Sequence, residues 1–270
     1  MATSSEHRRL TPLTDTPVEE APPPYEAKPH NSPAPDSQTA PRPGSGPPGP
    51  QITRQFPPAF NVYSKSFSGT LLLGEHRDKP FYGLSIHTGL SSSPPIVLHH
   101  GPADSFPPLA SVEHHSFSSR MSITLPPAPK GSPGGAPVVE LESKADFPSS
   151  SYIFSMGVGP NCERLETFEW RTSSGGAIAM LAGSSRGWKL VRLAHTVPPN
   201  AGPQAFRGSD GKEVVAVWTD AGMSMSKAAK FAFLGSGLTG ELGERWAIMA
   251  AISGLAIFVR QRQRRRNHNH

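Results

Sequence analysis

The sequence has little cysteine, no secretory start and no apolar run long enough for an ordinary transmembrane helix. Cys162 is the only cysteine in 270 residues, which excludes an internal disulfide and a cysteine-ligated zinc site. The first ten residues, MATSSEHRRL, lack the apolar core of a signal peptide, and no Asn-x-Ser/Thr acceptor occurs. These absences favour a reducing compartment. We expect a cytoplasmic protein, with membrane association and the nucleus as alternatives.

Positive charge is concentrated at one place in the chain. The formal net charge is +5, and the final stretch contains Arg260, Arg262, Arg264, Arg265 and Arg266. Without these arginines the basic and acidic residues are equal in number. Such a tail suits an anionic lipid surface or a nuclear import signal, and it also complements the negative end of a preceding helix. Because the rest of the chain is balanced, we do not expect nucleic-acid binding.

Residues 1–58 show neither helical nor strand periodicity. Pro, Ser, Thr, Ala and Gly dominate, and Tyr25 is the only aromatic residue before Phe56. A segment with so few apolar side chains cannot bury enough surface to offset the entropy cost of ordering. The composition therefore predicts a disordered, proline-rich tail.

The tail contains one recognisable ligand motif. Pro22, Pro23 and Tyr25 belong to the run Pro-Pro-Pro-Tyr, which matches the PPxY ligand of WW domains. A proline run is already close to the polyproline II conformation, so docking in an aromatic groove costs little ordering entropy. The alternative is a chance match within a proline-rich segment. The motif predicts recruitment of a WW-domain protein.

Beyond the tail, short runs rich in β-branched and aromatic residues are separated by Gly, Pro, Ser or Asp. Met121, Ile123 and Leu125 share one face of such a run, opposite polar residues. One wet and one dry face is typical of antiparallel sheet, and many short strands indicate a barrel or a sandwich. Two Pro/Gly-rich inserts, 126–136 and 197–211, are predicted as mobile loops. The predicted strands are 61–67, 69–75, 80–88, 95–100, 109–116, 119–125, 137–143, 151–158, 164–172, 177–182, 187–195, 213–219 and 230–235.

The region before the final arginines is the one strong helix candidate. Residues 246–259 carry no charge, so every face of this helix must be enclosed, either by a bilayer or by a protein core. As a helix they would span about 21 Å, whereas a bilayer core needs about 20 residues. We therefore expect a core helix over 241–260, with a tail anchor as the alternative. Its predicted core side chains are Trp246, Ile248, Met249, Ile252, Leu255, Ile257 and Phe258.

The predicted sheet and the predicted helix complete each other. About a dozen strands can close into a barrel wide enough to admit one helix, and the helix needs such an enclosure. The predicted fold class is mainly β, a closed antiparallel barrel of about twelve strands around a central hydrophobic C-terminal helix. The expected organisation is a tail over 1–58, a barrel over 59–260 and a basic tail over 261–270.

Several stretches resemble the tubby C-terminal-like superfamily, which includes tubby domains, phospholipid scramblases and LURP-one-related proteins. The likeness covers roughly residues 60–260 and is greatest to uncharacterised fungal members. The stretches are Phe-Glu-Trp-Arg at 168–171, Trp-Lys-Leu-Val-Arg at 188–192, Glu-Val-Val-Ala-Val-Trp at 213–218, Phe-Ala-Phe-Leu-Gly at 231–235 and the final helix.

The resemblance implies a barrel of about a dozen strands around a hydrophobic helix and, by analogy, contact with phosphoinositide membranes. The chain departs from the family in three respects. It lacks the cysteine cluster of scramblases, it has no acidic segment like their proposed calcium loop, and the lipid-binding residues of tubby domains cannot be aligned to positions in it.

Other motifs give weaker indications of a catalytic or ligand-binding site. Residues 183–187 match the G-x-S-x-G nucleophile elbow around Ser185, but a strand follows where the elbow needs a helix, so a hairpin turn is the better interpretation. His99-His100 and His114-His115 point to opposite faces of their strands and cannot chelate one ion, although a cross-strand pair of His100 with His114 is open. The Gly-rich stretch 235–240 lacks the ending of a P-loop and is predicted as a turn before the helix. We expect no metal and no cofactor.

These features together favour a non-enzymatic binding or adaptor protein. We expect a monomer that contacts anionic, phosphoinositide-containing membrane surfaces and recruits a WW-domain partner through its tail. The alternative is a tail-anchored membrane protein with residues 246–259 in the bilayer and a scramblase-like or tethering role. A third and weaker hypothesis is an esterase that uses Ser185.

Overall fold

The computed structural model describes residues 56–65, 69–87, 93–115, 120–146, 149–202 and 206–268. All of them belong to one compact unit, Pro50–His270. The predicted tail up to residue 55 lies outside the described residues. Phe56 is already part of the barrel core, because its ring contacts Phe60, Tyr82 and Phe233. The tail boundary expected at residue 58 was therefore slightly too late.

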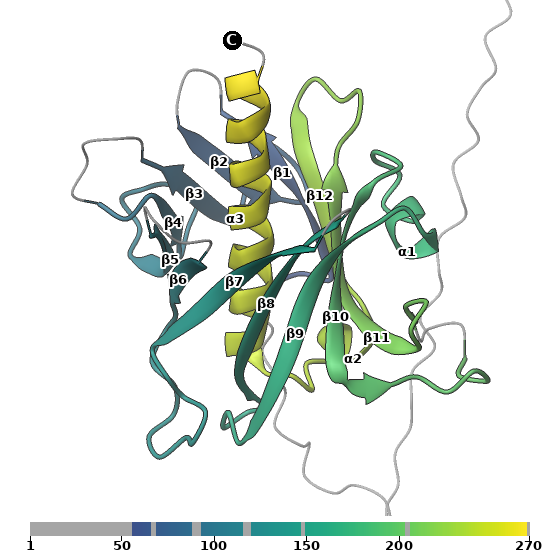
Figure 1. The fold of residues 1–270 in the computed structure, drawn as a ribbon. Helices are drawn as coiled ribbons and strands as arrows, with labels where there is room; N and C mark the ends of the chain where they lie inside the picture. Colours follow the sequence, from purple (N-terminus) through teal and green to yellow (C-terminus); the bar gives the residue numbers. More distant parts are fainter. Residues whose placement is uncertain are drawn as a thin grey trace, which may run out of the picture. The chain divides into compact units, whose positions relative to one another are not determined.

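The described strands form one closed antiparallel barrel, as predicted (Figure 1). Each strand pairs with its neighbours in the chain, and β1 closes the ring by pairing with β12, where Phe60 lies opposite Phe231. This up-and-down order leaves no free sheet edge in the described ring. The strands are β1 Ala59–Ser64, β2 Thr70–Gly74, β3 Tyr82–Ile86, β4 Ile96–His99, β5 Pro108–His114, β6 Arg120–Thr124, β7 Val138–Asp146, β8 Ser149–Val158, β9 Arg164–Ser173, β10 Gly187–Thr196, β11 Lys212–Asp220 and β12 Lys227–Phe233.

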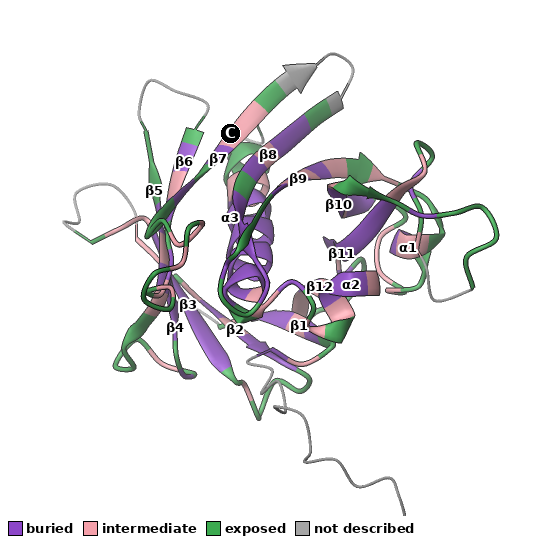
Figure 2. Ribbon diagram, turned by 90° about the horizontal axis from the view of Figure 1, so that it is seen from below, coloured by how far each residue is buried: buried purple, intermediate pink, exposed green. Residues whose placement is uncertain are grey.

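One long helix, α3 Glu244–His268, passes through this ring (Figures 1 and 2). Every predicted core side chain of the helix is buried, including Leu255 at 3% exposure. The helix bounds differ from the expected 241–260. Because arginine and glutamine are good helix formers, the basic segment continues the helix instead of forming a separate tail. Among the described helices, none carries an apolar stretch of the length a bilayer crossing requires.

Aromatic side chains and one hydrogen bond fasten the helix to the strands. The Trp170 Nε1–H donates to Ser253 Oγ at 2.9 Å, which gives the only polar side chain of the apolar stretch a buried partner. Gly254 lets the helix approach the rings of Trp170, Trp218 and Phe231, since a Cβ there would lie 3.2 to 3.3 Å from their atoms. The helix position is thus set by close packing rather than by hydrophobicity alone.

The predicted strand over 177–182 is wrong. This region forms a short helix, α1 Gly176–Ala179, in the connection between β9 and β10. Short apolar runs do not separate strand from helix by periodicity, and two alanines favour the helix here. Ile178 is fully buried against Val214 and Val217 in a second apolar cluster, distinct from the main barrel core.

A buried ion cluster joins β9, β10 and β11 to the segment before α3. Arg192 donates from Nε and Nη2 to the two carboxylate oxygens of Glu166 at 2.6 and 2.7 Å, and from Nη1 to Glu241 at 3.1 Å. Its Nη1 also reaches Glu213 at 3.5 Å, and Glu213 accepts from the backbone N–H and the hydroxyl of Ser236. Ser236 belongs to a short helix, α2 Gly235–Thr239, which occupies the stretch predicted as a turn.

Candidate functional site

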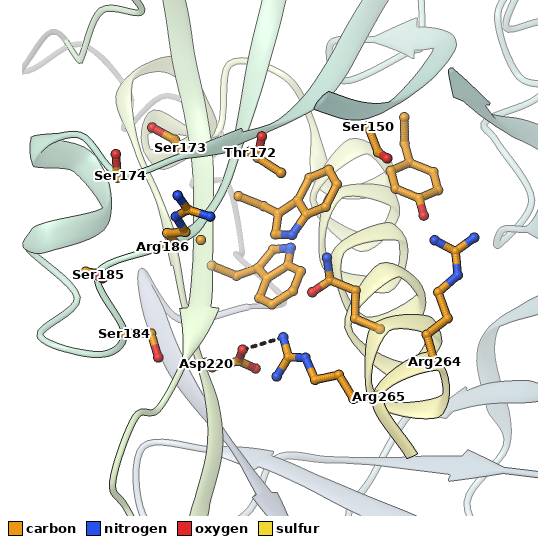
Figure 3. A pocket seen from close by; sticks show the side chains of 15 residues that line it. Ser150, Thr172, Ser173, Ser174, Ser184, Ser185, Arg186, Asp220, Arg264 and Arg265 are labelled. Carbon is orange, nitrogen blue, oxygen red and sulfur yellow. Dashed lines mark hydrogen bonds and ion pairs between the residues drawn. The ribbon is translucent and has the colours of Figure 1, made fainter. Parts of the chain in front are cut away.

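A cavity of about 740 Å³ opens at the barrel end where α3 terminates (Figure 3). We call it the arginine pocket. Its charged and amide lining comes from Arg186, Arg264, Arg265, Asp220 and Gln261. Six serine and threonine hydroxyls also line it, from Ser150, Thr172, Ser173, Ser174, Ser184 and Ser185. Guanidinium groups and hydroxyls together are the donors that recognise phosphate oxygens.

The pocket is assembled from the sheet and the helix. Arg186 comes from the connection that leads into β10, whereas Arg264 and Arg265 come from the last turns of α3 (Figure 3). The connection is held in place because Ser184 N–H donates to the Asp220 carbonyl at 2.8 Å and Lys230 Nζ donates to the Leu181 carbonyl at 2.9 Å. Arg186 therefore lies on a connection that hydrogen bonds hold against β11 and β12.

The pocket carries an excess of positive charge. Arg265 Nη2 pairs with Asp220 Oδ2 at 2.8 Å, so these two charges offset each other. Within the described residues, Arg186 and Arg264 form no ion pair. An entering anion would therefore meet two uncompensated guanidinium groups.

Two tryptophans supply the apolar part of the lining. The rings of Trp188 and Trp218 stack with centroids 6.2 Å apart and planes at 11°. The Trp218 Nε1–H is buried and has no hydrogen-bond partner among the described residues. A buried N–H without a partner costs stability, so it is a donor that a bound acceptor could satisfy.

The remaining predicted arginines face other sides of the same barrel mouth. Arg262 donates to Ser64 Oγ of β1 at 3.2 Å and lies over the Phe258 ring. Arg260 lies close enough to β5 that burial together with its charge lowers the pKa of His114. Burial and the neighbouring charge of Arg266 lower the pKa of Arg262. The five arginines thus form a collar around the helix end, and only Arg264 and Arg265 line the pocket.

Fully exposed methionines stand at the same end of the barrel. Met223 and Met225 lie in the turn between β11 and β12, with exposures of 102% and 105%. Met180, at the end of α1, is 52% exposed. Gly222 in this turn packs beside Gly183 of the connection that carries Arg186. Flexible apolar side chains therefore border a cationic pocket.

The sequence predicts a role for the helix arginines but not for the other residues that line the pocket. Arg186 lies in the segment predicted as a hairpin turn, for which the sequence predicts no binding role. The structure replaces the simple hairpin with the longer connection through α1. A charged residue next to a Ser/Gly-rich strand start was the only available signal, and it is common in loops.

The other motifs do not assemble a reactive site in the described residues. Ser185 lines the arginine pocket, but β10 begins at Gly187, so the helix required by a nucleophile elbow does not follow it. The cross-strand pair of His100 with His114, left as an alternative for metal binding, does not form. Ile96 at the start of β4 pairs with Val112, which puts His114 beyond the opposite end of β4 from His100. No cluster of metal-ligating side chains occurs in the described ranges.

The PPxY residues Pro22, Pro23 and Tyr25 lie outside the described residues. Comparison with known proteins adds no further assignment. The chain has no significant match to any protein-family model, to any curated protein or to any solved structure.

Proposed function

We propose that this protein is a non-enzymatic binding module whose arginine pocket holds a phosphorylated lipid headgroup at an anionic membrane surface. The observation that carries the proposal is the pair of guanidinium groups, Arg186 and Arg264, that line a hydroxyl-rich cavity without a carboxylate partner in the described residues. Phosphoinositide headgroups offer several phosphate oxygens to such donors. The resemblance to the tubby C-terminal-like superfamily supports the same class of ligand by analogy.

The surroundings of the pocket favour a membrane over a free small anion. Arg260, Arg262 and Arg266 extend the positive charge around the helix end, where each would add about 1 kcal/mol near an anionic leaflet. Met223 and Met225 project fully into solvent beside this collar. Exposed apolar side chains next to basic residues are the pattern of interfacial binding, because the apolar part enters the acyl boundary while the charges meet the headgroups.

Vesicle co-sedimentation tests this proposal. The purified full chain is expected to bind phosphatidylcholine vesicles that contain a phosphoinositide, and not vesicles of phosphatidylcholine alone. The double substitution Arg186→Gln and Arg264→Gln should weaken binding by about 30-fold, since two contacts of about 1 kcal/mol each are lost. Added salt should weaken binding of the unmodified chain because exposed charges are screened.

A matched control makes the same change of charge at the opposite end of the barrel. Arg77→Gln with Lys79→Gln, in the exposed connection between β2 and β3, should leave vesicle binding within about twofold of the unmodified chain. Met223→Ser with Met225→Ser should weaken binding without changing the melting temperature. Equal loss in the Arg77/Lys79 control, or no vesicle binding by the unmodified chain, would contradict the proposal.

The proline-rich tail supplies the second half of the proposed function, recruitment of a WW-domain partner. Pro22, Pro23 and Tyr25 match the ligand spacing, and polyproline II geometry lowers the entropy cost of docking. The full chain should be captured by an immobilised WW domain of the PPxY-binding class. Tyr25→Ala should abolish capture, whereas Tyr63→Phe, in β1, should leave it unchanged. Capture that persists in Tyr25→Ala would count against this partner.

A further inference from the structure

A second cavity, of about 790 Å³, lies at the other end of the barrel, where α3 begins. Its size falls within the range of about 300–1,000 Å³ that is usual for small-molecule pockets. The lining is dominated by prolines and aliphatic side chains from four segments of the chain. The lining includes Pro107, Leu109, Pro126, Pro160, Arg245 and Ile248.

Arg245 is a buried cation without a counter-charge. It is only 8% exposed, and no ion pair joins it to any carboxylate in the described residues. Its Nε–H donates to the Pro126 carbonyl at 2.8 Å, and Nη2 donates to the Ala136 carbonyl. The third nitrogen, Nη1, is buried and has no hydrogen-bond partner in the described part of the chain. A buried charge with an unused donor is unfavourable unless an anion or another strong acceptor meets it.

The start of α3 presents further donors to the same cavity. Glu244, Arg245 and Ile248 all line it, so the first turn of a 25-residue helix borders the space. The first backbone N–H groups of a helix have no intrahelical acceptor, and the helix dipole places partial positive charge there. Glu244 is exposed, so water screens its negative charge, and no ion pair links it to Arg245. The Arg245 guanidinium and the helix N-terminus thus favour an acceptor at this side of the cavity.

The rest of the lining determines what the acceptor is attached to. Four of the lining side chains carry neither charge nor a hydrogen-bond donor, namely those of Pro107, Leu109, Pro126 and Pro160. The exposed imidazole of His100 is the only aromatic ring among the lining residues of the described chain. Grooves that bind proline-rich peptides are instead lined by several aromatic rings. An aliphatic chain fits such walls, and a polar or highly charged ligand does not.

We propose that this cavity binds an aliphatic carboxylate, with the carboxylate accepting from Arg245 Nη1 and the N-terminus of α3 and the alkyl chain lying against the prolines, Leu109 and Ile248. The arginine pocket lies at the opposite end of the helix. The two proposals therefore rest on different residues, and either can fail without the other.

Calorimetric titration of the full chain with dodecanoate and with dodecanol, both below their aggregation concentrations, tests the proposal without any substitution. Dodecanoate should bind at least about tenfold more tightly than dodecanol, because only the carboxylate satisfies the guanidinium. It should also raise the melting temperature more than the alcohol does. Equal affinity of the two compounds, or binding of neither, would overturn the proposal.

Variants locate the binding site. Arg245→Lys retains a charge but lacks the forked donors, and it should reduce dodecanoate affinity about tenfold or more while leaving dodecanol affinity unchanged. Arg264→Gln with Arg265→Gln removes charge at the other barrel end and should leave dodecanoate binding as it is. If this double variant loses dodecanoate binding, the carboxylate binds at the arginine collar and the proposed cavity site is wrong. Should Arg245→Lys fail to fold, the comparison of carboxylate with alcohol and the Arg264/Arg265 variant still decide the matter.

Discussion

Replacing Leu255 by arginine is expected to prevent the barrel from folding. Leu255 is 3% exposed on α3 and belongs to the main core cluster inside the ring of strands. An arginine there would be a buried charge with no carboxylate partner among the described core side chains of that cluster. Such a change costs several kcal/mol, more than about 4 kcal/mol by comparison with other severe core changes. Domains of this kind are stable by only about 5–15 kcal/mol.

The soluble yield and the far-ultraviolet circular dichroism of Leu255→Arg measure this effect. Gln263→Arg is the matched control, since it adds the same side chain to an exposed position of the same helix. The control should keep the melting temperature of the unmodified chain. The tail-anchor alternative predicts the opposite for Leu255→Arg, namely a folded, soluble domain that has lost its membrane. A folded Leu255→Arg variant would thus contradict a helix enclosed by its own barrel.

Replacing Arg192 by methionine is expected to cost about 3–5 kcal/mol of unfolding free energy at pH 7, the usual penalty for breaking a buried ion cluster by removing one partner. Glu166 and Glu213 are 8% and 6% exposed. Glu213 would lose its guanidinium partner, and Glu166 would keep only the longer ion pair with Arg164 at 3.5 Å. Urea unfolding measures the difference. Arg120→Met is the control, because Arg120 pairs with Glu142 at an exposed position and should cost less than about 1 kcal/mol.

The same substitution should change how stability depends on pH. Burial alone would raise the pKa of Glu166, but the hydrogen bonds and charge of Arg192, with a smaller effect of Arg164, hold that pKa below its ordinary value of 4.5. A carboxylate with a lowered folded pKa contributes stability that is present above pH 4.5 and is lost as the pH falls through the folded pKa.

The difference in unfolding free energy between Arg192→Met and the unmodified chain should therefore become smaller in acid. Without Arg192, only the weaker effect of Arg164 opposes the effect of burial on the pKa of Glu166, so the variant loses less stability than the unmodified chain as the pH falls below 4.5. Urea unfolding at pH 7, 5, 4 and 3 follows the trend. A constant difference across these values would show that Glu166 is not the group that couples to Arg192.

The strand pattern is a local property, and that is why so much of the barrel could be predicted. Alternation such as that of Met121 and Ile123 requires only that one face be dry, whatever lies opposite. Enclosure of residues 246–259 follows in the same way, since an uncharged helix has no face for water. The predicted strand over 177–182 failed because a short apolar run suits a helix as well as a strand, and its packing against β11 decides between them.

Binding features depended on which strands meet, and no local pattern contains that information. Arg186 and Arg264 share a pocket because β10 begins at the barrel end where α3 terminates, a consequence of strand direction and register around the whole ring. Arg192 interrupts the alternation of β10, and the structure explains this by a register shift between Leu190 and Val191 and by the carboxylates gathered around the guanidinium.

By itself the sequence determined that the sheet has one apolar face and that the apolar helix must be enclosed on every side, because burial of apolar surface follows from residue order along each element. Only the tertiary structure decided where charges were left without partners. Whether Arg245 Nη1 or the guanidinium of Arg264 finds a carboxylate depends on segments distant in the chain, and electrostatic partners act through space rather than along the backbone.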